Sequence, residues 1–233
     1  MDIALFVAIT FFSSLLQGTM GIGFAIIYVT LSSFIFPYLE VLSSERVLAI
    51  LFMVPVLLRF RDKIRWRHIW IPLIFSILGT RIALLIMKVL DERSLIVALG
   101  AILTLSGIAN MVLKKEWHFK GNWISGAIVG VIIGTLAGIC GMAGPVIALY
   151  YLGIEELSED KDRYFATTVT LFELMGIIQT VEFLLNGYFP ERGWTLSLIG
   201  IIPTLAGIFV GLKLFDRINV AQVKMLMQAY SLA

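Results

Sequence analysis

Two glycine-rich interruptions lie inside long apolar stretches of this 233-residue chain, and they are its best candidates for chemistry. The first reads Gln17-Gly-Thr-Met-Gly-Ile-Gly23 and the second reads Ala137-Gly-Ile-Cys-Gly-Met-Ala-Gly-Pro145. They lie 120 residues apart, so that Gly18 matches Gly138 and Gly21 matches Gly141. Matching breaks in the two halves of an apolar chain are typical of an internally duplicated membrane protein, in which they mark the binding site.

The residue types in these breaks suit the binding of an anion. Glycine allows positive φ and close backbone approach, and Pro145 suits the first turn of a following helix. A helix that begins at mid-membrane depth presents free N–H groups and its positive dipole end, which favour an anion. The alternative is that the glycines only permit tight packing or a plain hairpin. The candidate binding residues in the two breaks are Gln17, Gly18, Thr19, Gly21, Gly23, Gly138, Cys140, Gly141 and Gly144.

Two ionisable residues fall near the centres of later apolar runs, where ionisable groups are candidates for function. Arg81 could present its guanidinium fork to a sulfonate or a carboxylate. Glu173 could couple protons to transport if burial favours its neutral form. Alternatively, the two side chains pair with each other, or Arg81 extends to the membrane surface. Thr168 lies on the same run as Glu173 and joins the candidate site, although such hydroxyls often bond their own helix.

The composition excludes several other classes of protein. Hydrophobic residues make up 59% of the chain and charged residues 15%, whereas a soluble domain has about 25% charged residues. Mean hydropathy is +0.95, so we predict a polytopic membrane protein. Cys140 is the single cysteine, which excludes an internal disulfide and a thiolate metal site. The sequence contains no recognisable catalytic pair, metal-ligand cluster, cofactor motif or basic patch for nucleic acid, so we expect neither an enzyme nor a nucleic-acid partner.

The apolar runs predict an all-α integral membrane protein built from two related halves. They cover residues 3–17, 22–36, 45–58, 69–87 and 95–113, then 123–137, 145–153, 164–185, 194–212 and 218–233. In lipid the backbone groups of a segment must pair within it, so helices are expected. The first two runs of a half, about 15 and 9 residues long, reach only roughly 22 and 14 Å, against a hydrocarbon core of ~30 Å. We expect re-entrant or half-spanning helix pairs there, and three or five crossings in each half.

Basic residues predict the orientation of the chain. Residues 59–67 hold five cations and one anion, which places this loop in the cytoplasm. The corresponding loop 186–193 then lies outside, whereas the acidic loop 155–162 lies inside. Residues 1–120 and 121–233 are therefore expected to be inverted repeats. The last run ends at Ala233, too early for a full span, so we expect its helix to be truncated.

Further glycines predict close helix packing. Four of them recur at every fourth position from Gly126 to Gly138 and form one helical face. Small residues with this spacing favour tight contact between membrane helices. Gly207 and Gly211 are interpreted in the same way.

The sequence around the second break carries a further pattern. It consists of Gly-Ile-Cys-Gly-Met-Ala-Gly-Pro-Val-Ile-Ala-Leu-Tyr at 138–150, then Asp162-Arg163 opening a threonine-rich helix that ends at Asn186-Gly187. This pattern resembles the sulfite exporter TauE/SafE family over nearly the whole chain, most clearly at 18–37 and 126–187. Phe24, Ala25, Ala143 and Val146 depart from the glycines and the second proline that family members often have. The resemblance assigns the family's glycine breaks to Gly18, Gly21, Gly23, Gly138, Gly141, Gly144 and Pro145.

The resemblance implies a membrane transporter of a small sulfur-containing anion such as sulfite, sulfoacetate or another organosulfonate. Together with the paired breaks, it predicts alternating access about a site between two inverted repeats, in a lipid bilayer and without a cofactor. A carrier of another anion, such as a carboxylate, is the alternative within transport. A membrane subunit that only scaffolds partners is the alternative from another class. The sequence leaves open the direction of transport, the coupling ion and whether the protein forms a homo-oligomer.

Overall fold

The computed structural model describes residues 2–91, single positions and short pieces between 93 and 104, residues 121–141 and residues 143–218. Every regular element in these ranges is a helix, which confirms the all-α prediction. Most of the predicted run 95–113 lies outside the described residues. Nearly all of the run 218–233, with its expected truncation, lies outside them as well.

The helices follow the predicted order. The first half contains α1 (Asp2–Met20), α2 (Phe24–Ser32), α3 (Tyr38–Ala49), η1 (Ile50–Phe52), α4 (Met53–Arg59), η2 (Arg61–Lys63), η3 (Trp66–His68) and α5 (Trp70–Met87). The second half contains α7 (Trp123–Cys140), α8 (Gly144–Leu152), α9 (Glu155–Ser158), α10 (Lys161–Leu185) and α11 (Glu191–Phe215). In the described part of the chain, six segments are long and apolar enough to cross a membrane: Ile3–Met20, Tyr38–Arg59, Trp66–Met87, Trp123–Cys140, Lys161–Leu185 and Glu191–Phe215.

The helices beside the breaks differ from the prediction in length. The helices α2 and α8 that follow the breaks have nine residues each, so that α8 has the predicted length and α2 is shorter than the predicted run 22–36. The helices α1 and α7 that precede them have 19 and 18 residues, because each continues into the glycine sequence and ends at Met20 or Cys140. The run predicted at 45–58 begins at Tyr38, directly after Pro37. This earlier start brings seven more residues into the helical segment.

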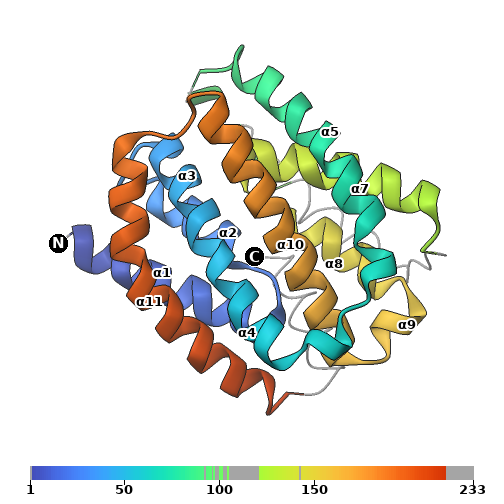
Figure 1. The fold of residues 1–233 in the computed structure, drawn as a ribbon. Helices are drawn as coiled ribbons and strands as arrows, with labels where there is room; N and C mark the ends of the chain where they lie inside the picture. The colour runs from blue at the N-terminus through green and yellow to red at the C-terminus, as the bar shows by residue number, and fades with distance from the viewer. Residues whose placement is uncertain are drawn as a thin grey trace.

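The long helices pack reciprocally between the two halves. α1 lies along α11, and α7 lies along α5, so each helix that precedes a break packs on a long helix of the other half. α3 and α10 lie between these pairs, with α1 and α11 on the left and α5 and α7 on the right in Figure 1. Because the halves exchange neighbours, they form one interlocked unit.

Glycines allow both helix pairs to approach closely. A Cβ atom on Gly134 would overlap backbone atoms of Ser76 on α5. A Cβ atom on Gly207 of α11 would likewise overlap Ser14 on α1, and Gly211 meets α1 one turn further along. The predicted packing role of these glycines is confirmed.

α1 and α7 begin at opposite ends of the molecule. Phe6, near the start of α1, packs against Phe36 with ring centroids 5.5 Å apart, and the guanidinium of Arg192, where α11 begins, lies over the same Phe36 ring. Gly121, just before α7, lies against His68. His68 belongs to the other end, where α10 begins and α11 finishes. The two helix–break–helix hairpins therefore run in opposite directions.

Ion pairs between the halves close the end that carries His68. Glu156 lies 2.9 Å from Arg65, 2.5 Å from Arg67 and 3.1 Å from His68. Partial burial raises the pKa of Glu156, but the hydrogen bond from His68 and the charges of Arg67 and Arg65 outweigh burial and lower the pKa overall. The basic loop 59–67 and the acidic loop 155–162 thus lie at the same end, as the predicted topology requires.

Replacing Gly134 by alanine is expected to destabilise the protein, because α5 must move to admit one methyl group. Overpacking of this kind costs about 1–3 kcal/mol, which thermal unfolding in detergent would detect. Gly100→Ala is the matched control, since no atom lies within 4 Å of the position its Cβ would take. A Gly134→Ala protein as stable as the wild type would contradict the close crossing of α5 and α7.

Glu156→Gln is expected to lower stability at neutral pH by about 1 kcal/mol, since surface ion pairs contribute little each. The folded pKa is lowered, so the carboxylate stabilises the fold above its unfolded pKa of about 4.3. This contribution is lost as the pH falls through the lower folded value. Thermal midpoints of variant and wild type should therefore differ at neutral pH and converge in strong acid, with the exposed Glu155→Gln as control. A gap that persists in acid would assign the effect to packing.

Candidate functional site

Both breaks adopt backbone geometry that residues with a Cβ atom seldom reach. φ is +74° at Gly141, which ends α7. It is +80° at Gly21 and +122° at Gly23, the residues that separate α1 from α2. Left-handed glycines commonly end helices because they carry no steric penalty there. These three positions therefore require glycine for the backbone itself, whatever else they do.

The two breaks touch each other inside the protein. A Cβ atom on Gly144 would lie 3.4 Å from the Cβ of Ile22 in the first break. A Cβ atom on Gly141 would lie 3.5 Å from Ala25 at the start of α2 and 3.4 Å from the Glu45 carboxylate. The two interruptions predicted to form one site are thus neighbours.

Gln17 links the first break to α10. Its side-chain oxygen accepts a hydrogen bond from the backbone N–H of Phe24, the first residue of α2, at 3.0 Å. Its side-chain nitrogen donates to Glu173 Oε1 at 3.2 Å. Gln17 is 1% exposed and Glu173 is 0% exposed. The side chain thereby supplies a buried backbone donor with the acceptor that water cannot provide there.

Two residues of α3 donate hydrogen bonds to the carbonyl groups at the end of α7. Arg46 Nη2 donates to the carbonyl oxygens of Ala137 at 3.0 Å and Gly138 at 2.9 Å. The Tyr38 hydroxyl donates to the carbonyl oxygen of Ile139 at 2.6 Å. A cation at this end of a helix also complements the negative end of its dipole. The permanently charged guanidinium of Arg46 therefore stabilises the end of α7 at the second break.

Arg46 is one member of a buried ion pair. Its Nη1 lies 3.5 Å from Glu45 Oε2, and the two side chains are 1% and 4% exposed. Its guanidinium also lies over the ring of Phe183, 4.0 Å from the centroid. Buried charges persist when they are paired and hydrogen-bonded. Within a membrane-spanning segment they are strong candidates for function.

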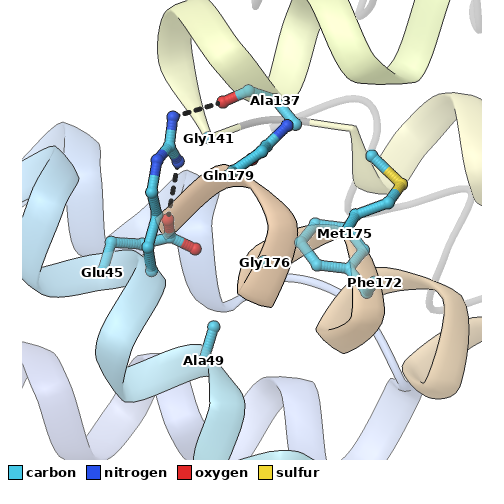
Figure 2. Close-up of a pocket in the computed structure, with 9 residues that line it drawn as sticks. Glu45, Ala49, Ala137, Gly141, Phe172, Met175, Gly176 and Gln179 are labelled. Atoms are coloured by element: carbon cyan, nitrogen blue, oxygen red, sulfur yellow. Dashed lines mark hydrogen bonds and ion pairs between the residues drawn. The ribbon is translucent and has the colours of Figure 1, made fainter. Parts of the chain in front are cut away.

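A small pocket lies between α3, α7 and α10 where these groups meet (Figure 2). Its lining residues are Glu45, Arg46, Ala49, Ala137, Gly141, Phe172, Met175, Gly176 and Gln179. Glu45 lies on one side of the pocket, and the apolar Phe172 and Met175 lie on the other. The Gln179 side chain donates to Thr80 on α5 at 3.2 Å, which connects the pocket wall to the neighbouring helix. The pocket therefore combines a buried cation, backbone at a helix break and an apolar wall.

Three of the predicted site residues lie against neighbouring helices, and a fourth, Cys140, forms a hydrogen bond within its own helix. Gly18 and Thr19 face Gly211 on α11, with the Thr19 hydroxyl 3.3 Å from the Gly211 carbonyl oxygen. Gly138 packs on α5. The buried Cys140 thiol donates to the carbonyl oxygen four residues earlier at 3.1 Å. None of these four residues lines the pocket, although the Gly138 carbonyl group accepts a hydrogen bond from Arg46.

Arg81 and Thr168 also lie outside the pocket lining. Arg81 Nη2 is 2.7 Å from Glu182 Oε1, and 60% of the Arg81 side chain is exposed. Arg81 therefore pairs with Glu182, whereas the predicted alternatives were a pair with Glu173 or extension to the membrane surface. Thr168 is fully buried within α10, more than one turn before Glu173.

Sequence reasoning missed Tyr38, Glu45 and Arg46. The signal was present, because Glu45-Arg46 adjoins a long apolar stretch and ionisable residues at depth are candidates for function. The predicted helix began at residue 45, which put both charges at its end. Once the helix begins at Tyr38, the pair lies two turns inside a membrane-spanning segment.

The protein-family model for the sulfite exporter TauE/SafE family matches residues 6–233, which is nearly the full chain. Comparisons with curated proteins and with solved structures give no significant match. The family is one of membrane transporters, in accord with the six segments that can cross a membrane. The chain belongs to the sulfite exporter TauE/SafE family.

Proposed function

We propose that this protein is a secondary transporter of a small sulfur-containing anion, such as sulfite, sulfoacetate or another organosulfonate. The anion would bind between the two breaks. One observation carries the proposal: the breaks meet beside a buried pocket that holds the permanent cation Arg46. A carboxylate carrier would use the same chemistry, so the choice of a sulfur oxyanion rests on the family.

The start of α8 is the proposed contact for the anion. α8 begins at Gly144 without a side-chain cap on its N–H groups, and Pro145 occupies its first turn. Free N–H groups and the positive end of a helix dipole favour a negative charge. Arg46 adds a full positive charge on the pocket wall. Gly141 and Gly144 add no side chains of their own here, which favours close approach of a small oxyanion to the backbone.

We propose alternating access between two inverted repeats, residues 1–120 and 121–233, in the cytoplasmic membrane with loop 59–67 inside. The opposite directions of the α1–α2 and α7–α8 hairpins support the inversion. The reciprocal packing of α1 on α11 and of α7 on α5 supports it as well. A site at the junction of such repeats can face either side when one half moves against the other.

Glu173 is proposed as the proton-coupling residue. It is fully buried in the middle of α10 and its Oε1 accepts from Gln17. An ionisable group at such depth changes its surroundings strongly when it gains or loses a proton. Because Gln17 links Glu173 to the first break through two hydrogen bonds, protonation of Glu173 would change the geometry of the site.

Sulfite uptake into proteoliposomes tests the anion site. Arg46→Gln is expected to reduce uptake at least about tenfold, since hydrogen bonds to charged groups contribute ~1.5–3 kcal/mol. Arg46→Lys should retain part of the activity because it keeps the charge. Arg81→Gln is the matched control and should leave uptake near the wild-type level. Competition by sulfoacetate and acetate then separates a sulfonate carrier from a carboxylate carrier.

The opposite pattern, with uptake lost in Arg81→Gln and kept in Arg46→Gln, would move the anion to Arg81. Folded wild-type protein that moves no anion would favour the scaffold alternative. Thermal unfolding in detergent shows that each variant is folded before uptake is measured.

Glu173→Gln tests proton coupling. The variant removes the ionisable group while keeping its size, so an imposed pH gradient should change uptake by the wild type and leave uptake by the variant unchanged. The fold should survive, because a glutamine oxygen can still accept the hydrogen bond from Gln17. Wild-type uptake that ignores the pH gradient would rule out protons as the coupling ion.

A further inference from the structure

The two breaks are held by chemically different groups. At the second break, Arg46 and Tyr38 bind the carbonyl groups that end α7. At the first break, Gln17 binds the N–H group that begins α2 and is itself bound to Glu173. A guanidinium keeps its charge at all accessible pH values, whereas a carboxyl group gains and loses a proton. The hydrogen bonds that hold the first break therefore depend on a group that gains and loses a proton, whereas the donors that hold the end of α7 keep their protons.

The direction of each hydrogen bond at Gln17 follows from the backbone. The Phe24 N–H can only donate, so it must face the oxygen of the Gln17 amide. The amide nitrogen then faces Glu173, to which it can only donate. Glu173 Oε1 is therefore an acceptor whether or not the carboxyl group carries a proton. No described group forms a hydrogen bond with Oε2, which is buried and is the oxygen where a proton can bind.

We propose that Gln17 is a positioning residue that transmits the protonation state of Glu173 to the first break. This inference rests on the proposed role of Glu173 in transport. With Glu173 ionised, the bond from Gln17 is charge-assisted and roughly twice as strong as a bond between neutral groups. A proton taken up at Oε2 neutralises the acceptor and weakens the hold on Gln17. The Phe24 N–H and the start of α2 then lose their firm anchor on α10.

The other charges around Glu173 favour such a response. Glu45 on α3 lines the pocket together with Phe172, the residue before Glu173 on α10, and it is paired with Arg46. Two carboxyl groups in one buried region resist being ionised together. A proton that binds Glu173 therefore relieves repulsion while it loosens the first break.

Hydrogen–deuterium exchange of the full-length protein in detergent tests the linkage without any substrate. After correction for intrinsic exchange, the peptide covering residues 21–30 should exchange about tenfold faster at acidic than at neutral pH. Gln17→Met keeps the length of the side chain and removes both hydrogen bonds, so this peptide should exchange fast at both pH values. In Glu173→Gln its exchange should no longer depend on pH. The peptide covering residues 141–147 should show no pH dependence in any of these proteins.

Ser13→Ala is the matched control on α1, because its hydroxyl bonds only within its own helix, to the Ile9 carbonyl oxygen at 2.6 Å. It should behave as the wild type does. Exchange at residues 21–30 that is independent of pH in the wild type, or still depends on pH in Gln17→Met, would overturn the proposal.

Transport assays separate this inference from the proposed function. When sulfite uptake is measured as a function of pH, Gln17→Met should move the midpoint of the uptake curve upward by about one pH unit. The reason is that loss of the Gln17 donor disfavours the ionised form of the Glu173 carboxyl group. The titration of sulfite itself is common to all variants and cancels in the comparison. pH-linked exchange together with absent uptake would reject the transport proposal alone. Normal uptake with an unshifted midpoint in Gln17→Met would reject the role of Gln17 alone.

Discussion

The structure depends on one constraint: backbone groups freed at a broken helix must find partners where water is scarce. Both breaks expose such groups in the protein interior, and each is supplied from another helix. Gln17 reaches forward to the N–H of Phe24, while Arg46 and Tyr38 reach across from α3 to the last carbonyl groups of α7. The polar residues at the centre of this apolar chain are thus the hydrogen-bond partners that stabilise its broken helices.

The same contacts concentrate charge where an anion could bind. Satisfying the end of α7 brings a guanidinium beside the site, and Glu45 accompanies it because a lone buried cation would be too costly. Satisfying the start of α2 brings an amide that must also bond Glu173. The residues that stabilise the breaks are therefore the same ones that we propose to act in transport. A substitution at Arg46 or Gln17 has to be interpreted with a conservative variant beside it.

Around this centre the two halves interlock through close helix crossings. Glycines let α7 pack closely on α5 and α11 pack closely on α1, so each hairpin packs against a helix of the opposite half. The end with the loops around His68 and Glu156 adds ion pairs between the halves. The proposed change of access would move the halves as units, because backbone-to-backbone contact leaves little room for single helices to bend.

The sequence by itself determined the membrane class, the helical fold, the paired breaks, the glycine packing faces and the family. Composition, periodicity and spacing are properties that can be determined from the sequence without any coordinates. It also pointed to Gln17 and Glu173, but its alternatives for Arg81 did not include Glu182, and it passed over Arg46. Only the tertiary structure decided those partners, because Arg46 lies 91 positions before the Ala137 carbonyl group it binds, and Gln17 lies 156 positions before Glu173. Contacts at such separations depend on how helices cross, and helix crossing is a property of packing that no local pattern encodes.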